Sequence, residues 1–394
     1  MLRRRFRVEF CNFTENNMME VSVRRFTFFC LVIIIVLFLW QLVYLITREE
    51  NISEVNLKIS EPKVILLYEV PKWMERIPVT NLDVDCVITA DKNYFSDIKK
   101  YDALVFSGSD NWSVNEVFPT ERSPYQYYVF ADLESPFFTK HKFLNISAEI
   151  YNLTMTYRRD SDIYWPYGFI SDKHVSYISD LQAPIWKLPS FEDDFNTELY
   201  HKVRTKTKIA AWFVSNCNAT SGRNDLVEVM KTHIDIDIYG KCGTLQCDKN
   251  NQSDCYKLVE ERYYFYLSFE NSLCKDYLTE KVFDIMKYYI VPVVYGGANY
   301  SNYLPPHSYI NANDFESATK LAIYLKDLVT NIGDYNKYFW WKKHYKYVST
   351  QKTYNNLCKK LHESSPDKFG QFIRSYENMN SWLVDGQCTT KPKI

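Results

Sequence analysis

The chain has 394 residues, of which 46% are hydrophobic, 17% aromatic and 24% charged, with a formal net charge of −1, 10 Gly and 14 Pro. This composition excludes a disordered polar chain, a collagen-like or low-complexity architecture, and a nucleic-acid binder that relies on a general excess of basic residues. The length favours two domains, or three.

An apolar run without a charged side chain, FTFFCLVIIIVLFLWQLVYLI, occupies residues 26–46. Roughly 20 such residues cross a bilayer as a helix. Arg48 and Glu49 follow directly, where a cleaved signal peptide would carry small residues. Arginine dominates the charges before the run, which places the N-terminus in the cytosol. We therefore expect a cytosolic tail (1–25), a transmembrane signal-anchor (26–46), a stem (47–62) and a lumenal remainder.

Cysteines and glycosylation sequons fit a lumenal location after the anchor. Cys11 and Cys30 lie before or within the anchor, whereas the other eight cysteines can pair in an oxidising compartment: Cys86, Cys217, Cys242, Cys247, Cys255, Cys274, Cys358 and Cys388. Sequence alone does not choose among their many pairings, and the lack of a C-x-x-C pair disfavours zinc. Seven sequons predict N-glycosylation at Asn51, Asn111, Asn145, Asn152, Asn218, Asn251 and Asn299.

Short apolar runs rich in β-branched and aromatic residues predict buried strands at 64–68, 86–89, 103–107 and 127–131. Segment 181–208 has no clear period and is the predicted linker. Beyond it, the sequence predicts strands at 209–214, 234–239, 264–269 and 291–295, and helices at 223–233, 276–288 and 315–329.

Strands that alternate with helices indicate parallel βαβ units. The fold class is therefore α/β, with two doubly wound parallel-sheet domains facing a cleft. We expect an N-terminal domain at 63–195, a C-terminal domain at 196–350 and a C-terminal disulfide-containing tail at 351–394.

Polar and basic residues follow two strands of the second predicted domain. Ser215 and Asn216 come after one strand, and Arg223 opens the next helix; Lys281 lies in the first turn of the helix after another strand. Ligands of doubly wound domains bind at the carboxyl ends of strands, and cations beside helix N-termini suit a diphosphate. Either cation could equally be an ordinary solvated residue. Neither segment has P-loop or Rossmann spacing.

A longer stretch of the sequence carries more information about function than these single residues. FYLSFENSLCKDYLTEKVFDIMKYYIVPVVYGG (265–297), followed by SYINANDF (308–315), resembles the signature region of the α1,3-fucosyltransferases. The resemblance extends upstream through WFVSNCNATSGR (212–223), DIYGKCG (237–243), YNLTMTYRRDSDIYWPYG (151–168) and FADLESP (130–136). The cysteine pattern is similar to that of invertebrate and plant members that act on N-glycans.

The resemblance implies a GT-B-like architecture and inverting transfer of L-fucose from GDP-β-L-fucose to the 3-hydroxyl of GlcNAc. The acceptor would be an N-glycan or a LacNAc or LacdiNAc-type glycan on a glycoprotein or glycolipid. It also implies a Golgi membrane protein, single-pass type II, with the catalytic part in the lumen. No cofactor is obligatory, no metal site is assigned, and Mn or Mg is at most a stimulant.

The same resemblance assigns roles to single residues. Glu134, in the ESP motif, matches the base that deprotonates the acceptor. Arg223 and Lys281 match the diphosphate-binding cations, and Glu280 matches the residue that holds the ribose hydroxyls. Further nucleotide contacts are expected from Tyr167, Ser215, Asn216, Asn271 and Tyr277. Tyr125 and Gln126 precede the base and are assigned to the acceptor.

Two alternatives stay open. D-x-D spacings at Asp83/Asp85, Asp160/Asp162 and Asp235/Asp237 suit a metal-dependent glycosyltransferase, although carboxylates that alternate along a strand can be a solvated edge. The YRRDSD string suits an internal ion-pair network as well as it suits ligand contact. The second alternative is a catalytically inactive Golgi paralogue that binds glycan or nucleotide.

Overall fold

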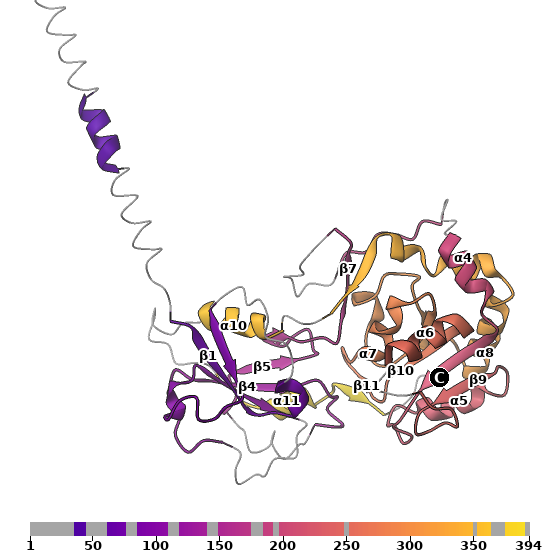
Figure 1. Cartoon of the computed structure of the whole chain (residues 1–394). Coiled ribbons are helices and arrows are strands. Elements are labelled where there is room, and N and C mark those ends of the chain that lie inside the picture. The colour runs from indigo at the N-terminus through magenta and orange to yellow at the C-terminus, as the bar shows by residue number, and fades with distance from the viewer. Residues whose placement is uncertain are drawn as a thin grey trace, which may run out of the picture. The chain divides into compact units, whose positions relative to one another are not determined.

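The computed structural model describes residues 35–44, 61–75, 85–108, 118–139, 149–174, 184–191, 197–247, 252–349, 353–363 and 375–390. The predicted cytosolic tail lies outside these residues. Of the predicted membrane segment, residues 35–44 are described, as a helix with exposed side chains, drawn in indigo in Figure 1. No helix within the described ranges combines the length and apolar character needed to span a membrane.

The first parallel sheet has the strand order β2-β1-β3-β4-β5-β6. Its strands are β1 (Lys63–Glu69), β2 (Cys86–Thr89), β3 (Ala103–Ser107), β4 (Tyr127–Asp132), β5 (Leu153–Thr156) and β6 (Ile163–Tyr164). β3 and β4 are buried along their whole length because both faces of the sheet are covered. Coverage on both faces explains why these strands are continuous apolar runs rather than alternating ones.

Two C-terminal helices cover this sheet from opposite sides. Side chains alternate between the faces of a strand, and Val105 and Val129 belong to one cluster whereas Leu104 and Tyr128 belong to the other. α10 (Thr353–Glu363) packs into the first cluster and α11 (Met379–Leu383) into the second. Figure 1 shows α10 beside β1, although the two are distant in sequence.

The second parallel sheet has the order β13-β12-β10-β8-β9. Its strands are β8 (Lys208–Phe213), β9 (Ile236–Tyr239), β10 (Tyr263–Phe269), β12 (Val291–Tyr295) and β13 (Ile310–Asn311). One core cluster joins it to α4 (Thr197–Arg204), α5 (Arg223–Met230), α8 (Ala318–Leu328) and α9 (Ile332–Lys337), and another joins it to α6 (Gln252–Arg262). The α/β class with parallel sheets is confirmed.

Two predictions about this half were wrong. The predicted linker, 181–208, contains α4, whose Leu199 and Val203 are buried in the core. The predicted helix 276–288 is only α7 (Glu280–Phe283) followed by the 3-10 turn η4 (Ile285–Lys287). Asp276 has a positive φ of 60°, so the chain turns there and the helix begins only after its N-cap, Thr279.

Two small antiparallel pairs and four disulfides complete the described fold. β11 (Leu273–Cys274) pairs with β15 (Cys388–Thr389), and β7 (Phe169–Asp172) pairs with β14 (Tyr345–Val348). The disulfides are Cys86–Cys358, Cys217–Cys242, Cys247–Cys255 and Cys274–Cys388, so the prediction that these eight cysteines pair is confirmed. Shorter elements are α2 (Lys72–Glu75), η1 (Ile98–Lys100), η5 (Tyr300–Asn302), η6 (Ala312–Asp314) and η7 (Trp340–Lys343).

Candidate active site

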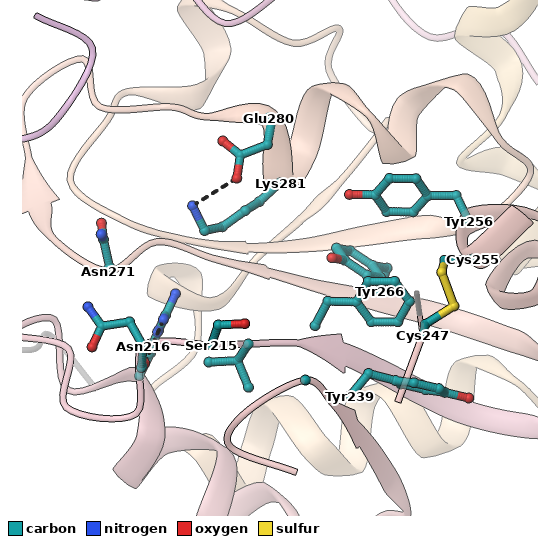
Figure 2. Close-up of a pocket in the computed structure, with 14 residues that line it drawn as sticks. Ser215, Asn216, Tyr239, Cys247, Cys255, Tyr256, Tyr266, Asn271, Glu280 and Lys281 are labelled. Carbon is teal, nitrogen blue, oxygen red and sulfur yellow. Dashed lines mark hydrogen bonds and ion pairs between the residues drawn. A yellow bond between two sulfur atoms is a disulfide. The ribbon is translucent and has the colours of Figure 1, made fainter. Parts of the chain in front are cut away.

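Loops at the carboxyl ends of β8, β9 and β10 surround a pocket of about 400 Å³. One end is polar and includes six of the predicted nucleotide-site residues: Ser215, Asn216, Arg223, Asn271, Glu280 and Lys281. The other end is lined by aromatic rings, among them Tyr239, Tyr256 and Tyr266, and by the Cys247–Cys255 disulfide. Figure 2 shows Asn216 and Asn271 at one end and Tyr256 with the disulfide at the other. The pocket therefore offers charged groups and flat apolar surfaces side by side.

Arg223 is held in place by the backbone at the ends of two strands. Its Nη1 donates to the Phe269 carbonyl oxygen at 2.7 Å, and its Nη2 donates to the Asn216 carbonyl oxygen at 2.9 Å. Its Nε is buried and lacks a hydrogen-bond partner among the described residues. Burial lowers the pKa of Arg223, but an arginine remains protonated in proteins. A fixed positive charge therefore faces the pocket.

Lys281 is fixed by oxygen atoms from its own loop. Its Nζ donates to Glu270 Oε2 at 3.1 Å and to Thr279 Oγ1 at 2.8 Å, and it lies 3.5 Å from Glu280 Oε1. Burial alone would lower the pKa of Lys281, but the negative charges of Glu270 and Glu280 outweigh it and raise the pKa. The ammonium group is therefore charged at neutral pH.

Glu270 is a site residue that sequence reasoning missed. It is fully buried, accepts hydrogen bonds from the Thr279 backbone N–H and hydroxyl at 2.9 Å each, and holds Lys281. Burial raises its pKa, although the charge of Lys281 opposes the rise. Its position directly after β10, where ligands of parallel sheets bind, was the available signal.

Asn271 presents an unsatisfied acceptor at the polar end of the pocket. Its side-chain Oδ1 is buried and has no hydrogen-bond partner among the described residues. A buried polar atom left unpaired costs roughly 1–3 kcal/mol. Such an atom is suited to a donor on a bound ligand.

Glu134 follows β4 of the first sheet and is half-buried. Tyr277 Oη donates to Glu134 Oε2 at 3.2 Å. Burial, reinforced by the neighbouring Tyr167 and Glu134, raises the pKa of Tyr277 well above its usual value, so the phenol stays protonated and can donate. The loop that carries Glu134 contacts the loop after β10, because Ser135 Oγ and Ser272 Oγ are 2.7 Å apart. The carboxylate therefore lies beside the loop that also carries Asn271 and Lys281.

Tyr167 and Tyr277 are not among the residues that line the pocket, and their role as nucleotide contacts stays a prediction. Tyr167 Oη donates to the Leu133 carbonyl oxygen at 2.6 Å, next to Glu134. Both tyrosines thus support the loop that carries the carboxylate.

The acceptor assignment of Tyr125 and Gln126 is also not supported. Both precede β4, whose 6 residues separate them from Glu134. At about 3.3 Å per residue, the strand places them some 20 Å away, at the opposite end of the sheet. Gln126 is buried, and its amide nitrogen donates to the Ile98 and Tyr101 carbonyl oxygens at 2.7 and 2.9 Å. Gln126 is a structural residue of the amino end of the strand.

Three of the D-x-D aspartates are engaged in other contacts. Asp160 forms a two-point ion pair with Arg158, at 2.9 and 2.6 Å, so one ion pair within the YRRDSD string is present. Asp162 accepts from the Tyr376 hydroxyl at 2.8 Å. Asp237 pairs with Lys208 and also accepts from Tyr263. Asp83 lies outside the described residues.

Three of the predicted glycosylation sites lie in the described residues. Asn218 and Asn299 are exposed. Asn152 is buried; its Nδ2 donates to Ser375 Oγ at 3.1 Å, and its Oδ1 accepts from the Tyr128 N–H at 2.8 Å. That nitrogen has no room for a glycan, so the prediction for Asn152 is not supported. Asn51, Asn111, Asn145 and Asn251 lie outside the described part of the chain.

Known proteins match both halves of the chain. The family model described as "Fucosyltransferase, N-terminal" matches residues 60–168, and "Glycosyltransferase family 10 (fucosyltransferase) C-term" matches residues 203–382. Alpha-(1,3)-fucosyltransferase C of Drosophila melanogaster is 41% identical over 312 residues, which cover 78% of this chain and 71% of that protein.

Two further relatives are more distant. Glycoprotein 3-alpha-L-fucosyltransferase A of Drosophila melanogaster is 35% identical, covering 66% of this chain and 48% of that protein. The rat 4-galactosyl-N-acetylglucosaminide 3-alpha-L-fucosyltransferase 9 is 34% identical, covering 66% of this chain and 64% of that protein. A crystal structure of an alpha1,3-fucosyltransferase with GDP has the same fold, with a TM-score of 0.50, 16% identity, and coverage of 81% of this chain and 94% of that one.

The chain has two parallel sheets covered by helices. A cationic pocket lies at the second sheet, and a carboxylate that follows a strand of the first sheet lies beside it. Together with these matches, the fold and the site define a glycosyltransferase. Within that class, the chain belongs to glycosyltransferase family 10, the fucosyltransferases.

Proposed function

We propose that this protein is an α1,3-fucosyltransferase that transfers L-fucose, with inversion, from GDP-β-L-fucose to the 3-hydroxyl of GlcNAc. The acceptor is an N-glycan or a LacNAc or LacdiNAc-type glycan on a glycoprotein or glycolipid. The 41% identity to an alpha-(1,3)-fucosyltransferase supports the reaction. The observation that carries the proposal is the hydrogen bond from Tyr277 to Glu134, which places a carboxylate next to the loop that forms the donor pocket.

The donor pocket fits a nucleoside diphosphate. Arg223 and Lys281 supply two fixed positive charges for the diphosphate, and they stabilise the charge that gathers on departing GDP. Glu280, whose side chain is 46% exposed, pairs with Lys281 through one carboxylate oxygen and can accept from ribose hydroxyls through the other. The aromatic end offers flat surfaces to the base.

On the acceptor side, Glu134 acts as general base. The sugar hydroxyl oxygen attacks the anomeric carbon of fucose while the bond from that carbon to the diphosphate oxygen breaks. The hydroxyl proton passes to Glu134, and the electron pair of the broken bond leaves with GDP. A positioned base of this kind contributes roughly 10²–10⁴-fold.

We also propose a Golgi membrane location, single-pass type II, with residues 26–46 as the anchor and the catalytic part in the lumen. The apolar run supports the anchor, and four disulfides support an oxidising compartment. Residues 63–195 would then bind the acceptor and residues 196–350 the donor. No divalent cation is obligatory in this proposal, and Mn or Mg is at most a stimulant.

The decisive experiment incubates the full chain with GDP-fucose and an array of GlcNAc-containing glycans, and then locates the new linkage. We expect fucose on the 3-hydroxyl of GlcNAc. Transfer to another hydroxyl, or binding of glycan without transfer as in an inactive paralogue, would contradict the proposal. Repeating the assay after exhaustive chelation tests the metal-dependent alternative, which requires transfer to stop.

A further inference from the structure

The turn that carries Glu134 is closed by a single buried carboxylate. Asp132, at the end of β4, is 2% exposed. Its Oδ1 accepts from the Glu134 backbone N–H at 2.9 Å, and its Oδ2 accepts from the Thr139 hydroxyl at 2.7 Å. Within the turn, the Ser135 carbonyl oxygen accepts from the backbone N–H groups of Phe138 and Thr139, at 2.8 and 3.1 Å. The positions of the residues between Glu134 and Thr139 are therefore fixed by the fold.

Two consecutive aromatic rings in this turn remain exposed. Phe137 and Phe138 are 39% and 37% exposed, whereas Pro136 before them and Thr139 after them are buried. Neither ring belongs to a hydrophobic cluster of the described residues. Burial of a phenylalanine stabilises a fold. More than a third of each of these two residues nevertheless remains in water, directly beside the proposed base.

The rings lie within reach of the reacting sugar. Phe137 is three positions after Glu134 in sequence, and consecutive Cα atoms are about 3.8 Å apart, so their Cα atoms are at most about 11 Å apart. Their closed turn shortens this distance further. A sugar whose hydroxyl contacts Glu134 can therefore bring its own ring, or the ring of its neighbouring residue, to this part of the turn.

A pyranose has a face of C–H groups that is apolar and weakly positive. An aromatic ring has a negative face, so it attracts such C–H groups and removes apolar surface from water at the same time. The fixed backbone of the turn means that little conformational freedom is lost when a sugar binds. A glycan chain is the occupant that matches both the chemistry of the rings and the hydroxyl that Glu134 needs.

We propose that Phe137 and Phe138 form an aromatic platform for the acceptor, on which a C–H face of the GlcNAc-containing glycan stacks while Glu134 takes the proton of its hydroxyl. The inference rests on the proposed function and deepens it. The platform takes over the acceptor role that the sequence assigned to Tyr125 and Gln126, which lie at the other end of β4.

The test uses the full chain with both phenylalanines changed to Ala, to Leu or to Tyr. For the Ala variant we expect the acceptor KM to rise roughly tenfold, since each lost stacking contact weakens binding several-fold. The KM for GDP-fucose and the slow hydrolysis of GDP-fucose without acceptor should stay unchanged. Leu should behave like Ala because it lacks a ring, and Tyr should restore the wild-type KM.

Tyr125→Ala is the matched control, since Tyr125 is an aromatic residue with 61% exposure that flanks the same strand. It should leave the acceptor KM unchanged. An unchanged KM in the double Ala variant would overturn the platform, and so would full rescue by Leu, which would indicate general hydrophobic docking of a protein or lipid. A thermal shift with GDP equal to that of wild type verifies that each variant is folded.

Equilibrium binding of a GlcNAc-terminated glycan in the presence of GDP, followed by saturation-transfer NMR, separates this inference from the proposed function. If saturation of the aromatic protons of the wild-type protein is transferred to the bound glycan but the protein transfers no fucose, the proposed function fails and the platform stands. If it transfers fucose and the Ala variant binds the glycan equally well, the platform fails and the function stands.

Discussion

The donor and acceptor sides of the site are constructed differently. On the donor side, Arg223 and Lys281 are each held by two or more protein oxygens before any ligand binds. On the acceptor side, the Glu134 carboxylate has one described side-chain hydrogen bond, from Tyr277, and is followed by two exposed rings. Preorganised charges suit one invariant leaving group, whereas an open, sparsely bonded surface can change its acceptor through a few side chains.

Glu134→Gln should have the largest effect, because it removes the proton acceptor but keeps the shape of the side chain. We expect transfer to fall by roughly 10²–10⁴-fold while GDP affinity stays unchanged. Initial rates and calorimetric titration with GDP measure the two quantities. Glu228→Gln, on the exposed surface of α5, is the control. If Glu134→Gln and wild type transfer fucose at equal rates, Glu134 is not the base.

Lys281→Ala tests the donor side. Loss of a charge-assisted contact to the diphosphate should weaken GDP binding by roughly 10- to 100-fold. Lys287→Ala is the matched control, since Lys287 lies in the adjacent turn and pairs with Asp284 at 2.6 Å. A GDP affinity that is the same in both variants would show that Lys281 does not contact the diphosphate.

Glu270→Gln tests whether the donor side is preorganised by a buried carboxyl. Burial raises the folded-state pKa of Glu270 above its usual 4.5. Its contribution to stability is therefore fully present below pH 4.5 and decreases as pH rises through the folded pKa.

The measurement is the free energy of unfolding of wild type and Glu270→Gln over a pH series. The stability of wild type relative to Glu270→Gln should be highest at acidic pH and fall toward neutral pH. The exposed Glu228→Gln control should show no such trend. A relative stability of wild type that rises with pH would mean that Lys281 stabilises the charged form of Glu270 more than burial opposes it.

Tyr277→Phe should have the smallest effect. It removes one hydrogen bond to Glu134 but keeps the ring that packs against Tyr157 at 5.0 Å. We expect kcat to fall by roughly 2- to 10-fold, with little change in the KM for GDP-fucose. A larger change in that KM than in kcat would assign Tyr277 to the donor side after all.

The sequence predicts those features of the fold and the site that depend on local residue patterns. Residues 103–107 and 127–131 were recognised as strands because both faces are covered, which makes each a continuous apolar run. Four pocket residues were predicted from their positions after strands, because parallel strands bring their carboxyl ends to one edge: Ser215, Asn216, Arg223 and Lys281. Asn271 and Glu280 were assigned by the family resemblance.

Contacts between distant segments could not be predicted in this way. The hydrogen bond of Tyr277 to Glu134 joins segments far apart in the sequence, and the role of Glu270 depends on a lysine eleven positions later that lies in another element. The position of Tyr125 and Gln126 relative to Glu134 depends on the direction of β4, which adjacency in sequence concealed. The disulfide pairing depends on the finished fold.

The path of the last segments has a consequence for biosynthesis. Leu357 of α10 and Leu383 of α11 belong to the two cores of the first sheet, although the whole second sheet is synthesised between β1 and these helices. A ribosome that has released β1 to β6 has therefore not yet supplied the residues that close either face. The half made first is completed last, so its exposed apolar faces must be protected from aggregation until translation is nearly finished.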